Sequence, residues 1–366
     1  MCIRDSAKAE CPVIIAGDAV TQSRAHKELI ALAEAIGAPV YVEFIPNTAS
    51  FPASHPLYRG SITRSQAGVR EVLDKHDLVF SVGGDLFTWS LPSNIDPWPA
   101  GLPLIHLDTD PWQIGKNYPA KVAILGDPKA TLPDITAAIG GRMTASAKSA
   151  AAARLKSTID IIKKDREAFR AKARALAGKT PVQPLALLEA IGAMLPKDAV
   201  VIEEILSSAP GARSLINSND EQSFYGLRGG GIGWGLPAAI GAKLALPDRP
   251  VVALVGDGSA MYTIQGLWTA ARYRLPIVWV IFNNTSYRIL KQRLVMLRGL
   301  AEQADTFVGM ELNDPAIDFV GLARSLGIDG ARAATVKDTT DLIGKALSSG
   351  KPMLIDVDME RGYKPM

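Results

Sequence analysis

Cysteine, histidine and long apolar runs are scarce in this sequence. Only Cys2 and Cys11 occur among 366 residues, too few for a disulfide framework, so a reducing, cytoplasmic setting is expected. No apolar run is long enough to cross a bilayer, and the opening MCIRDSAKAE lacks the apolar stretch of a signal peptide. No group of His or Cys residues has the spacing of zinc ligands. We therefore expect a cytoplasmic protein with no membrane partner and no zinc site.

An excess of one charge is also missing. The 40 Lys and Arg residues are interspersed with 37 Asp and Glu residues, and the formal net charge is only +3, so no nucleic-acid partner is predicted. The hydrophobic fraction of 48% and the charged fraction of 21% are typical of a well-packed globular protein. At about 150 residues per domain, the length corresponds to two domains.

Short apolar segments alternate with helix-forming segments in two regions of the chain. The segments typical of buried strands are PVIIAG, PVYVEF, DLVFSVGG, LPLIHLDTD and KVAILGD in the first region, and AVVIEE, VVALVG, PIVWVIF and MLIDVD in the second. This alternation predicts an α/β fold with two doubly wound parallel-sheet domains. We place them at residues 12–141, a Rossmann-like domain, and 181–366. Residues 1–11 are expected to be a non-native or leftover segment.

The segment at 142–180 is rich in Ala, Lys and Arg and predicts a linker followed by an exposed helix. A basic helix could bind a membrane or nucleic acid, but the interspersed acidic residues favour a solvated connector.

Two polar motifs end consecutive apolar runs in the second region. GDGS at 256–259 follows one run and NNTS at 283–286 follows the next. Because ligands of open parallel sheets bind outside the carboxyl ends of the strands, Asp257 and Asn284 should meet at one edge. Together with the Ser286 carbonyl they offer oxygen ligands of the kind that Mg²⁺ takes, with diphosphate oxygens and water completing the shell. Either motif alone would indicate no more than a turn; the pair is more specific.

The spacing from Gly-Asp-Gly to Asn-Asn resembles the cofactor motif of the thiamin-diphosphate enzymes, the family of pyruvate oxidase, pyruvate decarboxylase and acetolactate synthase. Among them the segment GDGSAMYTIQGLWTAARYRLPIVWVIFNN is most similar to the benzoylformate decarboxylases. The resemblance implies that Asp257, Asn284 and Ser286 hold Mg²⁺. It also implies that the backbone around Gly258, Ser259 and Tyr287 holds the diphosphate. Residues 12–141 then correspond to the middle domain and 181–366 to the diphosphate-binding domain.

Three more residues are assigned to the cofactor by the same resemblance. In LRGGGIGWG, the Gly230 carbonyl would accept from the aminopyrimidine, and Ile232 would support the bent cofactor from below. Three successive glycines are costly in an ordinary helix start, which favours a flat ring lying against the backbone. Ile232 could otherwise be a core residue. Ser207, after VVIEE, would donate to the diphosphate, with a helix cap as the alternative.

One histidine has an unusual setting. SFPASHPLYRG resembles the loop of benzoylformate decarboxylases whose histidine transfers protons, which assigns a catalytic role to His55. An exposed loop histidine without a role is an equally good interpretation.

The resemblance implies non-oxidative decarboxylation of a 2-oxo acid by a homodimer or homotetramer that uses thiamin diphosphate and Mg²⁺. Acetolactate-synthase-like carboligation is an alternative, as is a non-catalytic nucleotide-binding module. FAD is possible by resemblance, but no local motif requires it. Arg228, Arg288 and Ile289 differ from benzoylformate decarboxylase and indicate an acyl substrate with an acidic group. The family's N-terminal pyrimidine-binding domain, which supplies the activating glutamate, has no counterpart here, so this chain alone is expected to be inactive.

Overall fold

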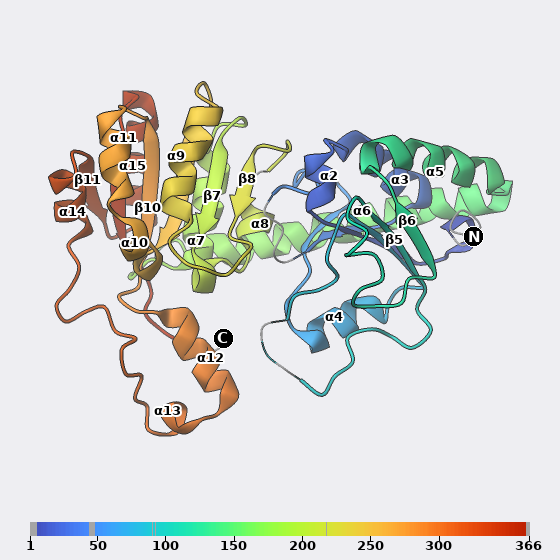
Figure 1. The fold of residues 1–366 in the computed structure, drawn as a ribbon, viewed down its shortest axis with the longest axis horizontal. Coiled ribbons are helices and arrows are strands. Elements are labelled where there is room, and N and C mark those ends of the chain that lie inside the picture. Colours follow the sequence, from blue (N-terminus) through green and yellow to red (C-terminus); the bar gives the residue numbers. More distant parts are fainter. Residues whose placement is uncertain (1–5, 44–47, 90, 92, 217, 364–366) are drawn as a thin grey trace. The chain divides into compact units, whose positions relative to one another are not determined.

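Two six-stranded sheets, each entirely parallel, organise the chain (Figure 1). A computed structural model describes residues 6–43, 48–89, 91, 93–216 and 218–363. The chain divides into one unit of residues 1–168 with 217–223 and another of 169–216 with 224–366. The predicted α/β class and the two parallel sheets are confirmed. The division falls inside a long helix within the predicted linker, and the short segment 217–223 belongs with the first unit.

The first sheet has the strand order β3-β2-β1-β4-β5-β6. Its strands are β1 (Pro12–Ala16), β2 (Val40–Val42), β3 (Tyr58–Ser61), β4 (Leu78–Val82), β5 (Leu104–Asp108) and β6 (Val122–Leu125). Its helices are α2 (Asp18–Gln22), α3 (His26–Ile36), α4 (Gln66–Leu73) and α5 (Pro128–Arg142). Side chains alternate across a strand, so Ile14 joins the core with α3 and α5 while Val13 and Ile15 join the core with α4.

The glycines at the end of β1 and β4 serve close packing. A Cβ atom on Gly17 would lie 2.2 Å from the Gly83 carbonyl oxygen and 2.4 Å from the Gly84 Cα. The backbone after β1 therefore packs directly on the backbone after β4, at the point where this Rossmann-like sheet reverses its strand order. This accounts for the glycines in AGDAV and GGDLF without a nucleotide.

The second sheet has the order β11-β12-β10-β9-β7-β8. Its strands are β7 (Val200–Glu204), β8 (Phe224–Gly226), β9 (Val251–Gly256), β10 (Ile277–Asn283), β11 (Asp329–Ala333) and β12 (Met353–Asp358). Its helices are α7 (Pro184–Met194), the 3₁₀ turn η1 (Leu206–Ser208), α8 (Ala212–Leu215), α9 (Gly235–Ala245), α10 (Asp257–Thr263), α11 (Gly266–Arg272), α12 (Arg288–Leu297), α13 (Leu300–Gln303), α14 (Phe319–Ser325) and α15 (Val336–Ser349).

One face of this sheet buries a continuous apolar core. Val251, Ala253 and Val255 of β9 and Trp279 of β10 pack there with helices α9, α11 and α14. Strand order reverses between β7 and β9, which is where open parallel sheets bind ligands. The fold therefore directs attention to the carboxyl ends of β7, β9 and β10.

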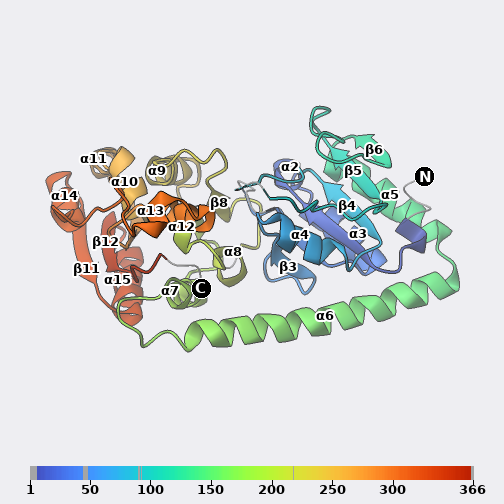
Figure 2. The same cartoon turned by 90° about the horizontal axis from the view of Figure 1, so that it is seen from below.

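The helix expected in the linker is a single long element, α6 (Ala145–Arg174), of 30 residues (Figure 2). Its arginines hold backbone carbonyls of the first unit: Arg154 donates to the Ile36 oxygen at 2.6 Å, and Arg166 donates to the His55 and Tyr58 oxygens, each at 2.6 Å. These anchoring roles agree with a connector. Within the residues that the structure describes, no helix combines the length and apolarity needed to cross a membrane.

A carboxyl group at the end of β2 holds the loop after β4. Glu43 accepts from the amides of Asp85 at 3.1 Å and Leu86 at 2.7 Å, and its side chain lies against Gly84. Burial raises the pKa of Glu43 to about 7, with smaller opposite contributions from those amides.

This raised pKa predicts how stability depends on pH. The folded chain keeps a proton on Glu43 that the unfolded chain loses near its ordinary pKa of 4.5, so stability is lost as pH rises from there through about 7. Glu43→Gln cannot titrate and should therefore lose less stability than the parent between pH 5 and pH 7.5. Urea unfolding at both pH values checks this, with the exposed Glu71→Gln as a control. Equal pH slopes for all three chains would contradict it.

Candidate functional site

Three buried residues meet where β9 and β10 end. Asp257 is the first residue of α10, and Asn284 and Ser286 follow β10; their exposed fractions are 2%, 5% and 5%. The Ser286 amide donates to Asp257 Oδ2 at 3.2 Å, and the Ser286 hydroxyl donates to Asn284 Oδ1 at 3.0 Å. Thr285 between them has a φ of +57°, a left-handed turn that brings both neighbours back to the carboxylate. The structure thus brings the predicted metal residues together.

The carboxylate of this cluster is buried and accepts from backbone amides. Burial raises the pKa of Asp257 to about 6, while the amides of Gly258 and Ser286 act in the opposite direction. Among the residues that the structure describes, no group of three or more His, Cys, Asp or Glu side chains could hold a metal ion. One carboxylate with neutral oxygens is a donor set that fits Mg²⁺, which keeps its remaining positions for phosphate and water.

The predicted diphosphate residues surround this cluster, with one difference in detail. Helix α10 begins at Asp257, so Ser259, 4% exposed, lies in its first turn and does not open the helix. A Cβ atom on Gly258 would lie 2.5 Å from a carbon of the Tyr287 ring. Gly258 is therefore needed for the packing of Tyr287 as well as for any approach of a ligand to the backbone.

The glycine run before α9 leaves its backbone accessible. Cβ atoms on Gly229, Gly230 and Gly231 would meet no heavy atom within 4 Å, and Gly230 has a φ of +74°. Ile232 is partly buried beside them. An open, side-chain-free backbone fits a flat ring, which is the shape that the predicted cofactor presents.

Sequence reasoning missed a second carboxylate at this edge. Besides Asp257, Glu204 ends the neighbouring strand β7 and has no exposed surface. It accepts from the amides of Gly233, at 2.6 Å, and Gly235. Burial raises the pKa of Glu204, against the effect of these amides. The available signal was the pair of acids that closes the apolar run VVIEE.

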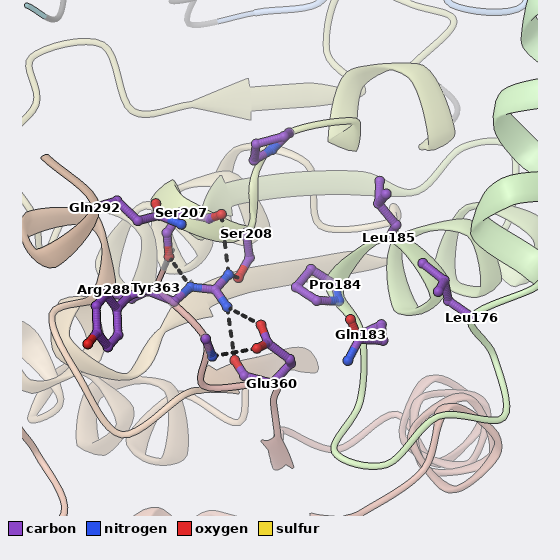
Figure 3. A pocket seen from close by; sticks show the side chains of 12 residues that line it. Leu176, Gln183, Pro184, Leu185, Ser207, Ser208, Arg288, Gln292, Glu360 and Tyr363 are labelled. Carbon is purple, nitrogen blue, oxygen red and sulfur yellow. Dashed lines mark hydrogen bonds and ion pairs between the residues drawn. The ribbon is translucent and has the colours of Figure 1, made fainter. Parts of the chain in front are cut away.

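Ser207 lies in η1 beside a cavity of about 690 Å³. Figure 3 shows Arg288 in the wall of this cavity, between Ser207, Ser208 and Glu360. Arg288 Nε donates to Ser207 Oγ at 3.1 Å, and Nη1 pairs with Glu360 Oε2 at 3.0 Å. The Ser207 hydroxyl accepts this bond, which leaves its own proton for another acceptor. Because Arg288 has an internal carboxylate partner, it gives no ground for inferring an acidic substrate.

His55 belongs to the first unit and has structural partners. Its Nδ1 accepts from the Leu57 amide at 3.2 Å, its Nε2 lies 3.4 Å from Glu34 Oε1, and its ring contacts Phe51 edge-on at 5.1 Å. Burial lowers the pKa of His55, with Glu34 acting in the opposite direction. The ring therefore has more packing and hydrogen-bond partners than an exposed loop histidine would have.

A buried carboxylate, an amide oxygen and an open glycine run at the ligand-binding edge of a parallel sheet are the arrangement expected of the thiamin-diphosphate class. Residues 7–135 match the thiamine pyrophosphate enzyme central domain, and residues 207–357 match the C-terminal TPP binding domain of the same enzymes. The chain belongs to this family, and thiamine pyrophosphate is the same compound as thiamin diphosphate.

Several relatives are similar over nearly the whole chain. Benzoylformate decarboxylase of Pseudomonas aeruginosa is 32% identical over 347 residues, which cover 94% of this chain and 60% of the relative. Sulfoacetaldehyde acetyltransferase of Rhodobacter capsulatus is 32% identical over 373 residues, covering 95% and 61%. The solved 4-hydroxybenzoylformate decarboxylase of Rhodococcus jostii has a TM-score of 0.82 at 29% identity, covering 99% and 64%. The chain thus spans about 60% of the length of its curated relatives.

The Arg288 network generates a prediction for stability. Arg288→Met leaves Glu360 without its partner and should lower the free energy of unfolding by about 2–3 kcal/mol, the lower end for a buried pair because Glu360 is one-third exposed. Urea unfolding measures this loss. The control is Arg361→Met, whose pair with Asp358 is exposed and should contribute less than about 0.5 kcal/mol. Equal losses in both variants would refute the importance of the network.

Proposed function

We propose that the protein catalyses non-oxidative decarboxylation of a 2-oxo acid with thiamin diphosphate and Mg²⁺. The observation that carries this proposal is the buried cluster of Asp257, Asn284 and Ser286 beside the open glycine run. When bound, the cofactor supplies the electron-accepting ring that decarboxylation of a 2-oxo acid requires. The family likeness to benzoylformate decarboxylases supports this reaction type.

The residues of this chain bind and orient the cofactor in this proposal. Asp257, the Asn284 side chain and the Ser286 carbonyl would hold Mg²⁺, which would supply positive charge for the diphosphate. The backbone around Gly258, Ser259 and Tyr287 and the Ser207 hydroxyl would bind the diphosphate oxygens. A diphosphate thus meets both a cation and hydrogen-bond donors at one sheet edge.

The glycine run would bind the other end of the cofactor. The Gly230 carbonyl would accept from the aminopyrimidine, and Ile232 would support the cofactor from below. His55 would transfer a proton to or from the reacting carbon. The resemblance also implies an activating glutamate on a pyrimidine-binding domain, so turnover has to be measured in a protein that includes such a domain.

Carboligation is the second candidate, because some relatives are named as acetolactate synthases. A putative acetolactate synthase large subunit of Mycobacterium tuberculosis is 36% identical over 46% of this chain. Turnover of a 2-oxo acid with and without an added aldehyde or second 2-oxo acid separates the two. Release of free aldehyde supports the decarboxylase, and formation of a 2-hydroxy ketone supports the carboligase.

Assembly into a homodimer or homotetramer is part of the proposal. Tyr262 and Trp268 on α10 and α11 are 59% and 57% exposed, and large exposed apolar side chains of this kind often mark interfaces.

The metal assignment predicts the effect of removing Asp257. Asp257→Ala should abolish Mg²⁺-dependent binding of thiamin diphosphate, because the cluster loses its carboxylate. Asn284→Ala should weaken binding less, because water can replace a neutral ligand. Calorimetric titration of the chain with the cofactor, with and without Mg²⁺, measures both effects. Asp248→Ala, an exposed acid before β9 at the opposite edge of the sheet, is the control. Unchanged affinity in Asp257→Ala would remove the metal site.

The role of His55 predicts a loss of turnover without a loss of cofactor binding. In the protein with its pyrimidine-binding domain, His55→Ala should lower kcat by about 10²–10⁴-fold, the usual contribution of a general acid or base. Steady-state kinetics and cofactor titration measure the two quantities. Glu34→Gln, which changes the partner of the ring and keeps the ring itself, is the matched control and should lower kcat far less. An unchanged kcat in His55→Ala would limit the residue to packing.

A further inference from the structure

The segment that follows the glycine run is fixed to the sheet from two sides. Glu204 at the end of β7 accepts from the amides of Gly233 and Gly235, and the Thr263 hydroxyl at the end of α10 donates to the Gly233 carbonyl at 2.8 Å. Glu204 is 0% exposed. The three elements β7, α10 and the loop before α9 are therefore joined by side-chain bonds to one short stretch of backbone.

These contacts explain why glycines occupy positions 233 and 235. A Cβ atom on Gly235 would lie 2.8 Å from both Cβ and Oε2 of Glu204, closer than real contacts allow. Gly233 has a φ of +100°, and a Cβ atom there would lie 2.6 Å from Cβ of Tyr262. Gly235 is thus required by the carboxylate and Gly233 by its backbone conformation and Tyr262, whereas Gly229, Gly230 and Gly231 face open space.

A buried carboxylate is costly unless hydrogen bonds replace its water. Each oxygen of Glu204 accepts from a backbone amide of the loop before α9. Glu203, its neighbour, has a separate task and accepts from the Ile205 amide at 2.9 Å. Charge-assisted bonds to backbone amides are strong and directional, so Glu204 is suited to fixing the position of the loop.

We infer that Glu204 is a positioning residue that holds residues 233–235 so that the Gly230 carbonyl and Ile232 are presented to the cofactor. This inference rests on the proposed function for the identity of the ligand, but the fixing of the loop itself does not. Glu204 acts through the backbone and touches no reacting atom.

The test uses Glu204→Gln and measures hydrogen exchange of the ligand-free chain. A Gln side chain can accept only one of the two amide bonds, so amides in a peptide covering residues 229–236 should exchange about 10–100-fold faster, as expected for loss of a charged hydrogen bond. Thiamin diphosphate titrated with Mg²⁺ should bind more weakly by a similar factor. Glu203→Gln is the matched control and should leave exchange at residues 233–235 unchanged.

Two further outcomes decide the inference. Unchanged exchange in Glu204→Gln would overturn it, and so would faster exchange spread over all of the second unit, because that marks a general packing residue. If the Gln variant does not fold, Glu204→Asp keeps the charge but is one methylene shorter, and the same criteria apply to it. If a protein that includes the pyrimidine-binding domain binds no thiamin diphosphate, the proposed function fails, whereas the exchange measurement still tests the anchoring of the loop.

Discussion

Hydrogen bonds from backbone amides to buried carboxylates are the interaction on which the second sheet's ligand edge depends. Asp257 and Glu204 end neighbouring strands and are both removed from water. A buried carboxylate is tolerated only if hydrogen-bond donors surround it. Here the donors are backbone amides of the turn after β10 and of the loop before α9. Asp257 thereby orders the turn after β10, and Glu204 orders the loop before α9. The two carboxylates thus organise the backbone around them.

The two carboxylates have different environments despite their similar burial. Asp257 accepts from the amides of Gly258 and Ser286, and the Asn284 and Ser286 side chains place further oxygens beside it. Around Glu204, the amides of Gly233 and Gly235 occupy both oxygens. Two adjacent acids at one sheet edge can thus have different tasks, one for binding and one for shaping the backbone. The difference between the two tasks follows from the groups that lie next to each carboxylate.

Much of this arrangement could be predicted from the sequence, because central parallel strands are continuous apolar runs. All five segments predicted as strands in the first region and all four in the second lie in β1, β2, β4–β6, β7, β9, β10 and β12. The strands β3, β8 and β11 were not predicted. They lie at sheet edges, are only partly buried and contain residues such as Arg59 and Arg332, so they lack the apolar signal.

The proximity of Asp257 and Asn284 could be predicted, because the two residues follow the ends of neighbouring strands. The hydrogen bond from the Gly233 amide to Glu204 could not be predicted, because no local sequence pattern specifies which loop lies over the end of a given strand.

The long helix α6 imposes a constraint on chain length. Arg154 and Arg166, twelve residues apart, bind carbonyls at Ile36 and at His55 and Tyr58. At 3.6 residues per turn, each added or deleted residue between them would rotate one arginine by about 100° relative to the other and shift it by about 1.5 Å. A single-residue change would therefore turn one guanidinium away from its carbonyls, whereas a change of seven residues would nearly restore the angle but move it by about 10 Å along the axis. Length variation between these two arginines is thus disfavoured at every step, because the carbonyls of the first unit fix both the distance between the arginines along the helix and their relative orientation.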